Sequence, residues 1–255
     1  MIHDNPGMKL YGLIGFPLSH SFSKGYFSDK FRQEKRSDCR YENFPLPSLE
    51  QLPALIDGHP KLVGLNVTIP YKEQVLYLLN SIDENARAIG AVNTIKIIRS
   101  QGKSILEGYN TDAYGFYTSL RPFLDRSIKN ALILGTGGAS KAVAYVLNNL
   151  GISCLFVSRN PKSGDHISYA DLCGPVLYNA QLVVNTTPVG MFPNEEACPD
   201  IPYEFITSQH LFYDLVYNPL ETRFLSKAKT MGARIVYGME MLHFQAEKAW
   251  DIWNS

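Results

Sequence analysis

A glycine-rich turn follows a short apolar run at residues 131–134 and precedes a helical pattern that extends to Leu150. The turn consists of Gly135, Thr136, Gly137, Gly138 and Ala139. Glycines in this context allow a tight turn and a close approach of the backbone to a pyrophosphate, which the next helix meets with its N–H groups. Ser140 replaces the third glycine of the usual pattern. The turn indicates a dinucleotide site, and a turn without a ligand stays the alternative because the motif alone is weak.

The strand expected at residues 152–157 ends at a short polar segment. This segment is Ser158, Arg159 and Asn160. Folds that bind NAD place an acidic residue at about this point for the ribose hydroxyls, whereas an arginine suits the 2′-phosphate of NADP. Arg159, with Lys162 nearby in the sequence, therefore favours NADP. An ordinary exposed arginine at a strand end is the other interpretation.

Neutral polar side chains stand at expected helix starts and strand ends, and one lies in the last expected helix. They are Ser21, Ser23, Asn66, Thr68, Asn93 and Gln245. The two serines, with nearby backbone N–H groups at the start of the first helix, could bind a carboxylate. The other four side chains suit a ligand with several hydroxyl groups, and a site built from them rejects analogues that lack those groups. Taken singly, the two serines also suit a helix cap and an exposed position, the asparagines suit turns, and the glutamine suits a solvent-facing helix position.

Two charged residues, Lys72 and Asp112, stand near expected helix starts. Lys72 is expected to begin a helix just after Pro70, and Asp112 opens the helix expected over residues 111–123. Side chains of these types can manage a hydroxyl proton while an alcohol is oxidised. Simpler interpretations stay open, because a carboxylate in the first turn stabilises a helix by capping and through the helix dipole, and a lysine at such a place is usually solvated.

Short apolar runs alternate with helical patterns along most of the chain, which is typical of parallel βαβ construction. Strands are expected at residues 9–14, 41–46, 62–69, 131–134, 152–157, 182–184 and 211–216, with a hairpin at 92–99 and 105–109. Helices are expected at residues 21–36, from Ser48, and at 111–123, 139–150 and 239–253. We predict an α/β protein of two domains, residues 1–112 completed by 238–255, and residues 113–237, with the last helix returning to the first domain.

The composition excludes several function classes. The 24 basic and 24 acidic residues balance without charge blocks, which argues against nucleic acid or an anionic membrane as partner. The 4 cysteines are scattered and the 6 histidines lack metal-ligand spacing, so neither a disulfide framework nor a metal site is expected. The first residues lack the apolar stretch of a signal peptide. We expect a cytoplasmic protein, monomeric or homodimeric, whose partners are small molecules.

Several separated segments match one known family in both order and spacing. They are residues 19–23 (Ser-His-Ser-Phe-Ser), 66–72 (Asn-Val-Thr-Ile-Pro-Tyr-Lys), 90–94 (Gly-Ala-Val-Asn-Thr), 108–112 (Gly-Tyr-Asn-Thr-Asp) and the turn at Gly135, followed by 185–191, 213–217, 238–242 and Gln245. Together these segments cover nearly the whole chain. The chain resembles the shikimate dehydrogenases. The resemblance implies an N-terminal α/β substrate domain and a Rossmann-like NADP-binding domain.

The resemblance also implies an activity and a role for each matching residue. The activity is the reversible, NADPH-dependent reduction of 3-dehydroshikimate to shikimate in aromatic amino acid (chorismate) biosynthesis. Lys72 and Asp112 match the catalytic pair of the family. Ser21 and Ser23 match the residues that bind the substrate carboxylate, and the other neutral polar side chains match contacts to the ring hydroxyls. The resemblance places Thr187, Val189, Gly238 and Met239 near the cofactor and Tyr217 between substrate and nicotinamide, although core packing or a simple turn would explain each of these positions.

Two departures from the family pattern and two alternatives stay open. Lys24 and Gly25 follow Ser23 where the family usually continues with proline, so the first helix is expected to start differently. Glu240 stands where the family often has a small residue near the nicotinamide. One alternative is a quinate/shikimate dehydrogenase that uses NAD, against which the paired serines and Arg159 argue. The other is a non-catalytic sensor of a ring acid or nucleotide, against which the catalytic pair argues.

Overall fold

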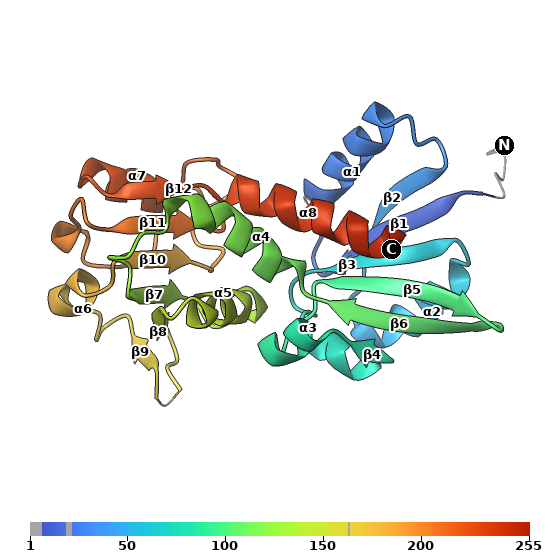
Figure 1. Cartoon of the computed structure of the whole chain (residues 1–255), viewed down its shortest axis with the longest axis horizontal. Helices are drawn as coiled ribbons and strands as arrows, with labels where there is room; N and C mark the ends of the chain where they lie inside the picture. Colours follow the sequence, from blue (N-terminus) through green and yellow to red (C-terminus); the bar gives the residue numbers. More distant parts are fainter. Residues whose placement is uncertain (1–6, 19–21, 163) are drawn as a thin grey trace. The chain divides into compact units, whose positions relative to one another are not determined.

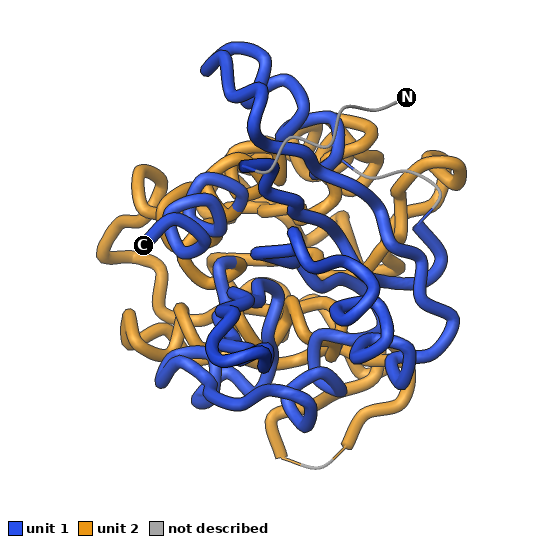
Figure 2. Tube along the Cα trace, turned by 90° about the vertical axis from the view of Figure 1, so that its right-hand side faces the viewer, with its two compact units in different colours: residues 1–111, 246–255 blue, residues 112–245 orange. Residues whose placement is uncertain are grey.

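The computed structural model describes residues 7–18, 22–162 and 164–255, so Ser21 lies outside the described residues. The chain divides into two compact units, and Figure 2 shows them in different colours. Unit 1 consists of residues 1–111 and 246–255, and unit 2 consists of residues 112–245. The end of the final helix therefore returns to the first half of the chain, as predicted.

Unit 1 contains a mixed sheet with the strand order β2-β1-β3-β5-β6-β4. Its strands are β1 (Lys9–Gly15), β2 (Cys39–Pro45), β3 (Leu62–Val67), β4 (Ser81–Ile82), β5 (Thr94–Ser100) and β6 (Lys103–Tyr109). Strand β1 pairs in parallel with both β2 and β3, whereas β5 and β6 form the predicted antiparallel hairpin. Its turn has Gln101 and Gly102 in the left-handed region, with φ angles of 49° and 74°.

Helices cover both faces of this sheet (Figure 1). They are α1 (Phe22–Gln33), η1 (Leu49–Gln51), α2 (Leu52–Gly58), η2 (Gln74–Leu78), α3 (Glu84–Ile89) and the C-terminal part of α8 (Gly238–Asn254). Along β1, Tyr11 and Leu13 pack towards α1 and α8, while Ile14 joins the core on the other face, because strand side chains alternate. A Cβ atom on Gly64 would lie 2.5 Å from the ring of Trp253, so this glycine lets α8 lie close against the sheet.

Unit 2 contains a six-stranded sheet with the order β12-β11-β10-β7-β8-β9. Its strands are β7 (Asn130–Leu134), β8 (Ser153–Ser158), β9 (His166–Ser168), β10 (Leu182–Asn185), β11 (Leu211–Asp214) and β12 (Arg234–Val236). Every pairing among the described strands of this sheet is parallel. The order reverses between β7 and β10, as in the doubly wound Rossmann fold, which binds its ligands beyond the carboxyl ends of the strands at that point.

Helices also lie on both faces of the second sheet. They are α4 (Thr111–Leu120), η3 (Arg121–Phe123), α5 (Gly138–Asn149), α6 (Gly174–Tyr178), η4 (Tyr203–Phe205), α7 (Arg223–Thr230) and the start of α8. Tyr213 of β11 contacts Phe116 of α4, whereas its neighbour Phe212 contacts Phe224 of α7 on the opposite face. The alternation along one strand thus assigns the two helices to different layers.

Some predicted boundaries were wrong for identifiable reasons. The first helix ends at Gln33 and not at Arg36, because Lys35 adopts a left-handed φ of 56°. The helix that begins at Thr111 ends at Leu120, where Pro122 lacks the N–H that an α-helix needs and a 3₁₀ turn follows. Strand β11 ends at Asp214, whose carboxylate accepts a hydrogen bond from the backbone N–H of Val216.

Lys72 does not begin a helix, contrary to prediction. It lies in a turn at residues 69–73, and the following helix is a 3₁₀ helix from Gln74 to Leu78. By contrast, Ser48 caps its helix as expected, because its hydroxyl accepts a hydrogen bond from the N–H of Glu50. The final helix starts at Gly238, one residue before the predicted start.

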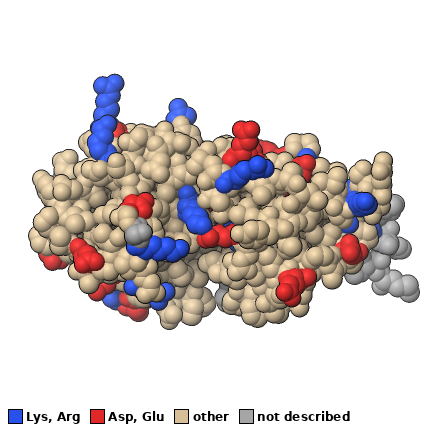
Figure 3. Space-filling view, turned by 90° about the horizontal axis from the view of Figure 1, so that it is seen from below, with Lys and Arg blue, Asp and Glu red and all other residues tan. Residues whose placement is uncertain are grey.

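Charged side chains of both signs are interspersed on the face that Figure 3 presents, in agreement with the balanced composition. The cysteines of the chain are all free thiols. Within the described residues there is neither a cluster of potential metal ligands nor a helix long and apolar enough to cross a membrane.

Candidate active site

The glycine-rich turn lies at the switch point of the unit 2 sheet. It follows β7, and the loop that follows β10 lies against it. Gly135 has a φ of 106°, and a Cβ atom there would lie 2.8 Å from Thr186 Oγ1 and 3.0 Å from Thr187 Cγ2. Both the backbone conformation and the close approach therefore require glycine at this position.

The start of helix α5 has the features of an anion site. Gly137 is its N-cap residue, and no side chain of the described residues caps it by a hydrogen bond. A Cβ atom on Gly137 would meet nothing within 4 Å, so the space beside this residue is open. The buried hydroxyl of Ser140 donates to the carbonyl of Gly137 at 2.6 Å, which uses this serine within the turn. The turn and helix start therefore fit a bound phosphate.

Arg159 lies at the same edge of the sheet. Strand β8 pairs with β7 so that Val157 lies opposite Leu134, and the segments after the two strands therefore begin side by side. Arg159 is exposed, and the N–H of Asn160 donates to Ser158 Oγ at 3.2 Å. Burial raises the pKa of Tyr169 and the charge of Arg159 opposes that shift, so the guanidinium also lies near this ring. The position suits recognition of a 2′-phosphate.

The loop after β10 is held by a side-chain amide that the sequence analysis did not select. The Oδ1 atom of Asn185 accepts hydrogen bonds from the N–H of Thr187 at 3.0 Å and from its hydroxyl at 2.6 Å. Thr187 Oγ1 in turn accepts from the N–H of Val189 at 3.3 Å. Two predicted cofactor residues, Thr187 and Val189, are thus brought together by one buried asparagine.

Helix α8 begins close to the end of β11. A Cβ atom on Gly238 would lie 2.6 Å from the carbonyl oxygen of Asp214, so glycine allows this approach. Met239 is half-buried and Glu240 is exposed, as is usual for a carboxylate in the first turn of a helix. Tyr217, three residues after Asp214, is half-buried.

In unit 1 the structure brings two predicted substrate residues into one hydrogen-bonded network. Asn66 Nδ2 donates to the carbonyl of Asn93 at 3.4 Å and to Thr94 Oγ1 at 3.3 Å. The Oδ1 atom of Asn93 accepts from the N–H of Thr111 at 2.7 Å, and its Nδ2 atom donates to Thr111 Oγ1 at 3.0 Å. This network holds the start of α4, because Thr111 is the first residue of that helix.

Tyr41 links this network to the first helix, although the sequence analysis had treated it only as part of a strand. Its buried hydroxyl donates to Asn66 Oδ1 at 2.8 Å. Burial raises the pKa of Tyr41, and a hydrogen bond with Ser23 opposes the shift. Tyr41 therefore contacts two predicted substrate residues, Ser23 and Asn66, that lie far apart in the sequence.

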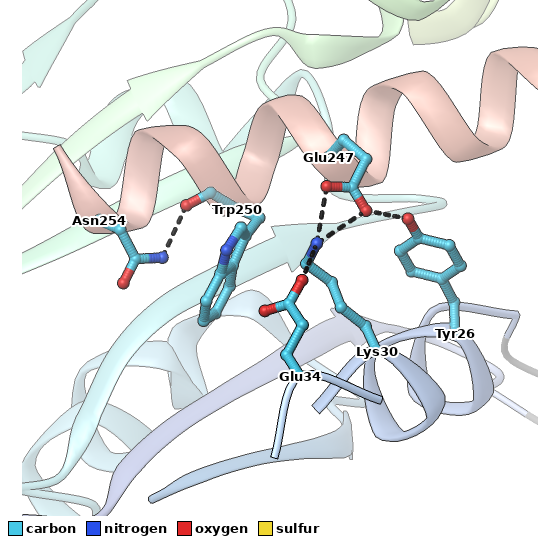
Figure 4. A network of polar contacts seen from close by, with 6 residues as sticks. All are labelled: Tyr26, Lys30, Glu34, Glu247, Trp250 and Asn254. Carbon is cyan, nitrogen blue, oxygen red and sulfur yellow. Dashed lines mark hydrogen bonds and ion pairs between the residues drawn. The ribbon is translucent and has the colours of Figure 1, made fainter. Parts of the chain in front are cut away.

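A second network holds helix α1 against the end of α8 (Figure 4). The ammonium of Lys30 lies 2.8 Å from Glu247 Oε2 and 2.7 Å from Glu34 Oε1, and the hydroxyl of Tyr26 donates to the same Glu247 carboxylate. Burial raises the pKa of Tyr26, and the hydrogen bond to Glu247 raises it further. Tyr26 follows the unusual Lys24-Gly25 pair, so this departure coincides with an anchor of the helix that carries Ser23.

Thr68 and Lys72 follow strand β3, and Asp112 lies at the start of α4. The carbonyl of Lys72 accepts a hydrogen bond from Val92 at 2.7 Å, and Lys72 itself is half-buried. Thr68, also half-buried, donates its N–H to Ile14 at 2.9 Å. Asp112, only 2% exposed, lies in the first turn of α4.

Gln245 of α8 is half-buried and lies beside α4. A Cβ atom on Gly115 would lie 3.1 Å from the backbone nitrogen of Gln245 and 2.5 Å from the carbonyl of Met241. The small residue in α4 therefore lets the two helices approach closely.

Comparison with known proteins identifies the family. Residues 13–95 match the family model described as shikimate dehydrogenase substrate binding domain. The "Shikimate dehydrogenase (NADP(+))" of Methanosphaera stadtmanae is 35% identical over 95% of this chain and 90% of its own length. The chain belongs to the shikimate dehydrogenase family.

Solved structures of the shikimate dehydrogenase family and of related enzymes share this fold. The shikimate 5-dehydrogenase of Thermus thermophilus, in complex with NADP(H) and shikimate, is 32% identical, with a TM-score of 0.82 over 96% of this chain and 93% of that one. A quinate dehydrogenase from Corynebacterium glutamicum in complex with NAD is 27% identical, with a TM-score of 0.84 over 96% of this chain and 93% of that one. Structures of this fold have thus been solved with NADP(H) bound and with NAD bound.

Proposed function

We infer that this chain is an NADP-dependent shikimate dehydrogenase, which catalyses the reversible reduction of 3-dehydroshikimate to shikimate in aromatic amino acid (chorismate) biosynthesis. The observation that carries the activity is the likeness, over nearly the full length of both chains, to relatives named "Shikimate dehydrogenase (NADP(+))". The geometry of the glycine-rich turn and of Arg159 supports the cofactor. A cytoplasmic location and a monomeric or homodimeric state are part of the proposal.

The cofactor site uses the carboxyl edge of the unit 2 sheet. The pyrophosphate is held by the N–H groups of the turn from Gly135 to Ala139, and the 2′-phosphate by Arg159 with Ser158 and Asn160. The nicotinamide end is held by Thr187, Val189, Gly238 and Met239. When bound, the nicotinamide supplies or accepts the hydride. The chain itself supplies binding, orientation and management of the proton.

The ring acid is bound by neutral polar groups. Its carboxylate is bound by the hydroxyls of Ser21 and Ser23, and its ring is contacted by Asn66, Thr68, Asn93, Gln245 and Tyr217. An amide that already has some partners within the protein presents its remaining hydrogen-bonding capacity in a fixed direction, so the buried network of unit 1 favours one arrangement of ring hydroxyls. A small polyhydroxylated acid is therefore the substrate class.

The proton of the reacting hydroxyl is managed by Lys72 and Asp112. In the oxidation direction, Nζ of Lys72 takes this proton while the Asp112 carboxylate holds the hydroxyl in place, and in the reduction direction Nζ returns it. The start of α4 is fixed by Asn93 through Thr111, which precedes Asp112 in the chain. The carboxylate is therefore presented from a rigid position.

A quinate/shikimate dehydrogenase that uses NAD is the second candidate, favoured by the likeness to the Corynebacterium glutamicum enzyme. An arginine in place of an acidic residue after β8 argues against it. The test measures initial rates with shikimate and quinate, each with NADP and with NAD. We expect the highest kcat/KM for shikimate with NADP. A higher kcat/KM with NAD or with quinate would favour the second candidate, and no turnover in any combination would favour a sensor.

A further inference from the structure

The carboxylate of Asp214 lies buried at the end of β11, with an exposed fraction of 0%. It accepts three hydrogen bonds from the surrounding protein. The donors are Asn185 Nδ2 at 3.0 Å, the backbone N–H of Val216 at 3.0 Å and Thr222 Oγ1 at 2.5 Å. A buried carboxylate is costly unless it is hydrogen-bonded in this way, so its presence calls for a role.

The contact to Asn185 sets the orientation of a side-chain amide. Asn185 pairs directly with Asp214 across the two strands, and both side chains are fully buried. Because Oδ1 of Asp214 already accepts the N–H of Val216, it acts as an acceptor, so the Nδ2 atom of Asn185 must face it and Oδ1 of Asn185 is left to accept from Thr187. A flipped amide would place two N–H donors against the N–H of Thr187. The Asp214 acceptor therefore selects the amide orientation that the loop after β10 requires.

We propose that Asp214 is a positioning residue for NADP, which acts through the Asn185 amide to hold Thr187 and Val189 in their binding arrangement before the cofactor arrives. The inference rests on the proposed function, because that function assigns the loop to the nicotinamide end of NADP. Preorganisation of this kind raises affinity by removing the cost of ordering the loop on binding. The carbonyl of Asp214 also lies against Gly238, another residue assigned to the cofactor.

A purely structural role predicts different results. Thr222 Oγ1 accepts from the N–H of Leu225 and so caps α7, which means that Asp214 also supports that helix start. If that were its whole contribution, replacing Asp214 would lower the free energy of unfolding without a selective effect on NADP. The positioning role predicts that a variant without the acceptor binds NADP more weakly and has an unchanged KM for shikimate. It also predicts that a side chain which keeps the acceptor preserves NADP binding.

The experiment compares Asp214→Leu, which removes the hydrogen-bond acceptor for Asn185, with Asp214→Asn, which keeps the shape of the side chain and one acceptor oxygen. We expect the Kd for NADP, measured by titration calorimetry without substrate, to rise roughly 10- to 100-fold in Asp214→Leu and by less than about threefold in Asp214→Asn. Tyr213→Phe is the matched control, since it removes a buried hydroxyl from the same strand that is bound to Ser119 on the opposite face. It should leave the Kd for NADP unchanged.

Hydrogen exchange of the ligand-free protein provides a readout that does not depend on activity. Asp214→Leu should accelerate exchange of the N–H groups of Thr187 and Val189, and Tyr213→Phe should not. Equal Kd values for NADP in Asp214→Leu and Asp214→Asn, with equal loop exchange, would overturn the inference.

If Asp214→Leu fails to fold, Asn185→Ala removes the same connection between Asp214 and Thr187 by deleting the amide that links them. An unchanged Kd for NADP in folded Asn185→Ala would likewise overturn the inference. If the wild-type chain binds no NADP, the proposed function fails. The exchange experiment then still decides whether Asp214 orders the loop, so the two failures are distinguishable.

Discussion

An asparagine near a strand end supports the proposed substrate site, and another supports the proposed cofactor site, but the two side-chain amides are oriented by different groups. In unit 1, the amide of Asn66 accepts a hydrogen bond from the phenol of Tyr41. In unit 2, the amide of Asn185 donates one to the carboxylate of Asp214. Burial raises the pKa of Tyr41, so this phenol stays neutral throughout the physiological range. Burial raises the pKa of Asp214 to about 7, against the effect of its three hydrogen bonds.

Because of this difference, substrate binding and cofactor binding should respond differently to pH. The substrate-side amide is oriented by a group whose charge does not change near neutrality, whereas the cofactor-side amide is oriented by one that titrates there. The charge of Asp214 also acts on Tyr203 and, from the opposite face of the strand, on Tyr213, whose pKa values are raised mainly by burial. We therefore expect moderate changes of pH to act on the cofactor side of the site.

The largest expected effect belongs to neither amide but to the proton-transfer group. Lys72→Ala should lower turnover roughly 10²- to 10⁴-fold, with a much smaller change in the Kd for shikimate, because the general base is lost and the binding groups remain. Asp112→Asn should impair both turnover and binding. Because the two residues act as one unit, the double variant should be scarcely slower than Lys72→Ala. Near-normal turnover in Lys72→Ala would remove this residue from the mechanism; circular dichroism checks that each variant is folded.

Arg159→Ala tests the cofactor side at its exposed end. The loss of a charge-assisted hydrogen bond should weaken NADP binding by roughly 1 to 3 kcal/mol and leave the use of NAD nearly unchanged. Lys162→Ala, a neighbouring exposed cation, is the control and should have a smaller effect. The measurement is kcat/KM for both cofactors. Equal weakening of both would show that Arg159 does not recognise the 2′-phosphate.

Thermal or denaturant unfolding as a function of pH tests whether Asp214, unlike Tyr41, titrates near neutral pH. A raised carboxyl pKa contributes stability that is fully present below the ordinary value of 3.8 and is lost as pH rises through about 7. Between pH 5 and pH 7 the free energy of unfolding of the wild type should therefore fall by about 2 kcal/mol relative to Asp214→Asn. Parallel curves for the two proteins would show that Asp214 is already ionised at pH 5.

Tyr41→Phe is the substrate-side counterpart and has the smallest expected effect. Removing a neutral hydroxyl leaves Asn66 Oδ1 without its buried donor, which costs roughly 1 kcal/mol. The KM for shikimate should rise about fivefold, the Kd for NADP should not change, and the ratio between variant and wild type should be constant from pH 6 to pH 8. A pH-dependent ratio, or an effect on NADP, would contradict the assignment of Tyr41 to the substrate side.

The sequence was sufficient for elements with strong local signals. The apolar run before Gly135 and the helix after it predicted β7, the turn and α5, and the structure has all three. The short strands β4, β9 and β12 and the helices α3, α6 and α7 were not predicted, because two to eight residues give too little periodicity to detect. The proline before Lys72 predicted a helix start, although Lys72 lies in a turn that a 3₁₀ helix follows.

The residues that orient the side chains and the loop of the predicted site could not be found from local sequence signals. Tyr41 and Asn66 are 25 positions apart, and Asn185 and Asp214 are 29 apart, so only the sheet registers bring them together. Each lies in a strand where its type is also consistent with a structural role. One available signal was the polar residue at the end of an otherwise apolar strand, which Asn185 and Asp214 both show.

A crystal structure with NADP and shikimate bound tests the central claim most directly. We expect Nζ of Lys72 and the carboxylate of Asp112 both to lie within hydrogen-bonding distance of the hydroxyl that is oxidised, and the guanidinium of Arg159 to contact the 2′-phosphate. A complex in which another side chain contacts that hydroxyl, with Lys72 and Asp112 both out of reach, would contradict it.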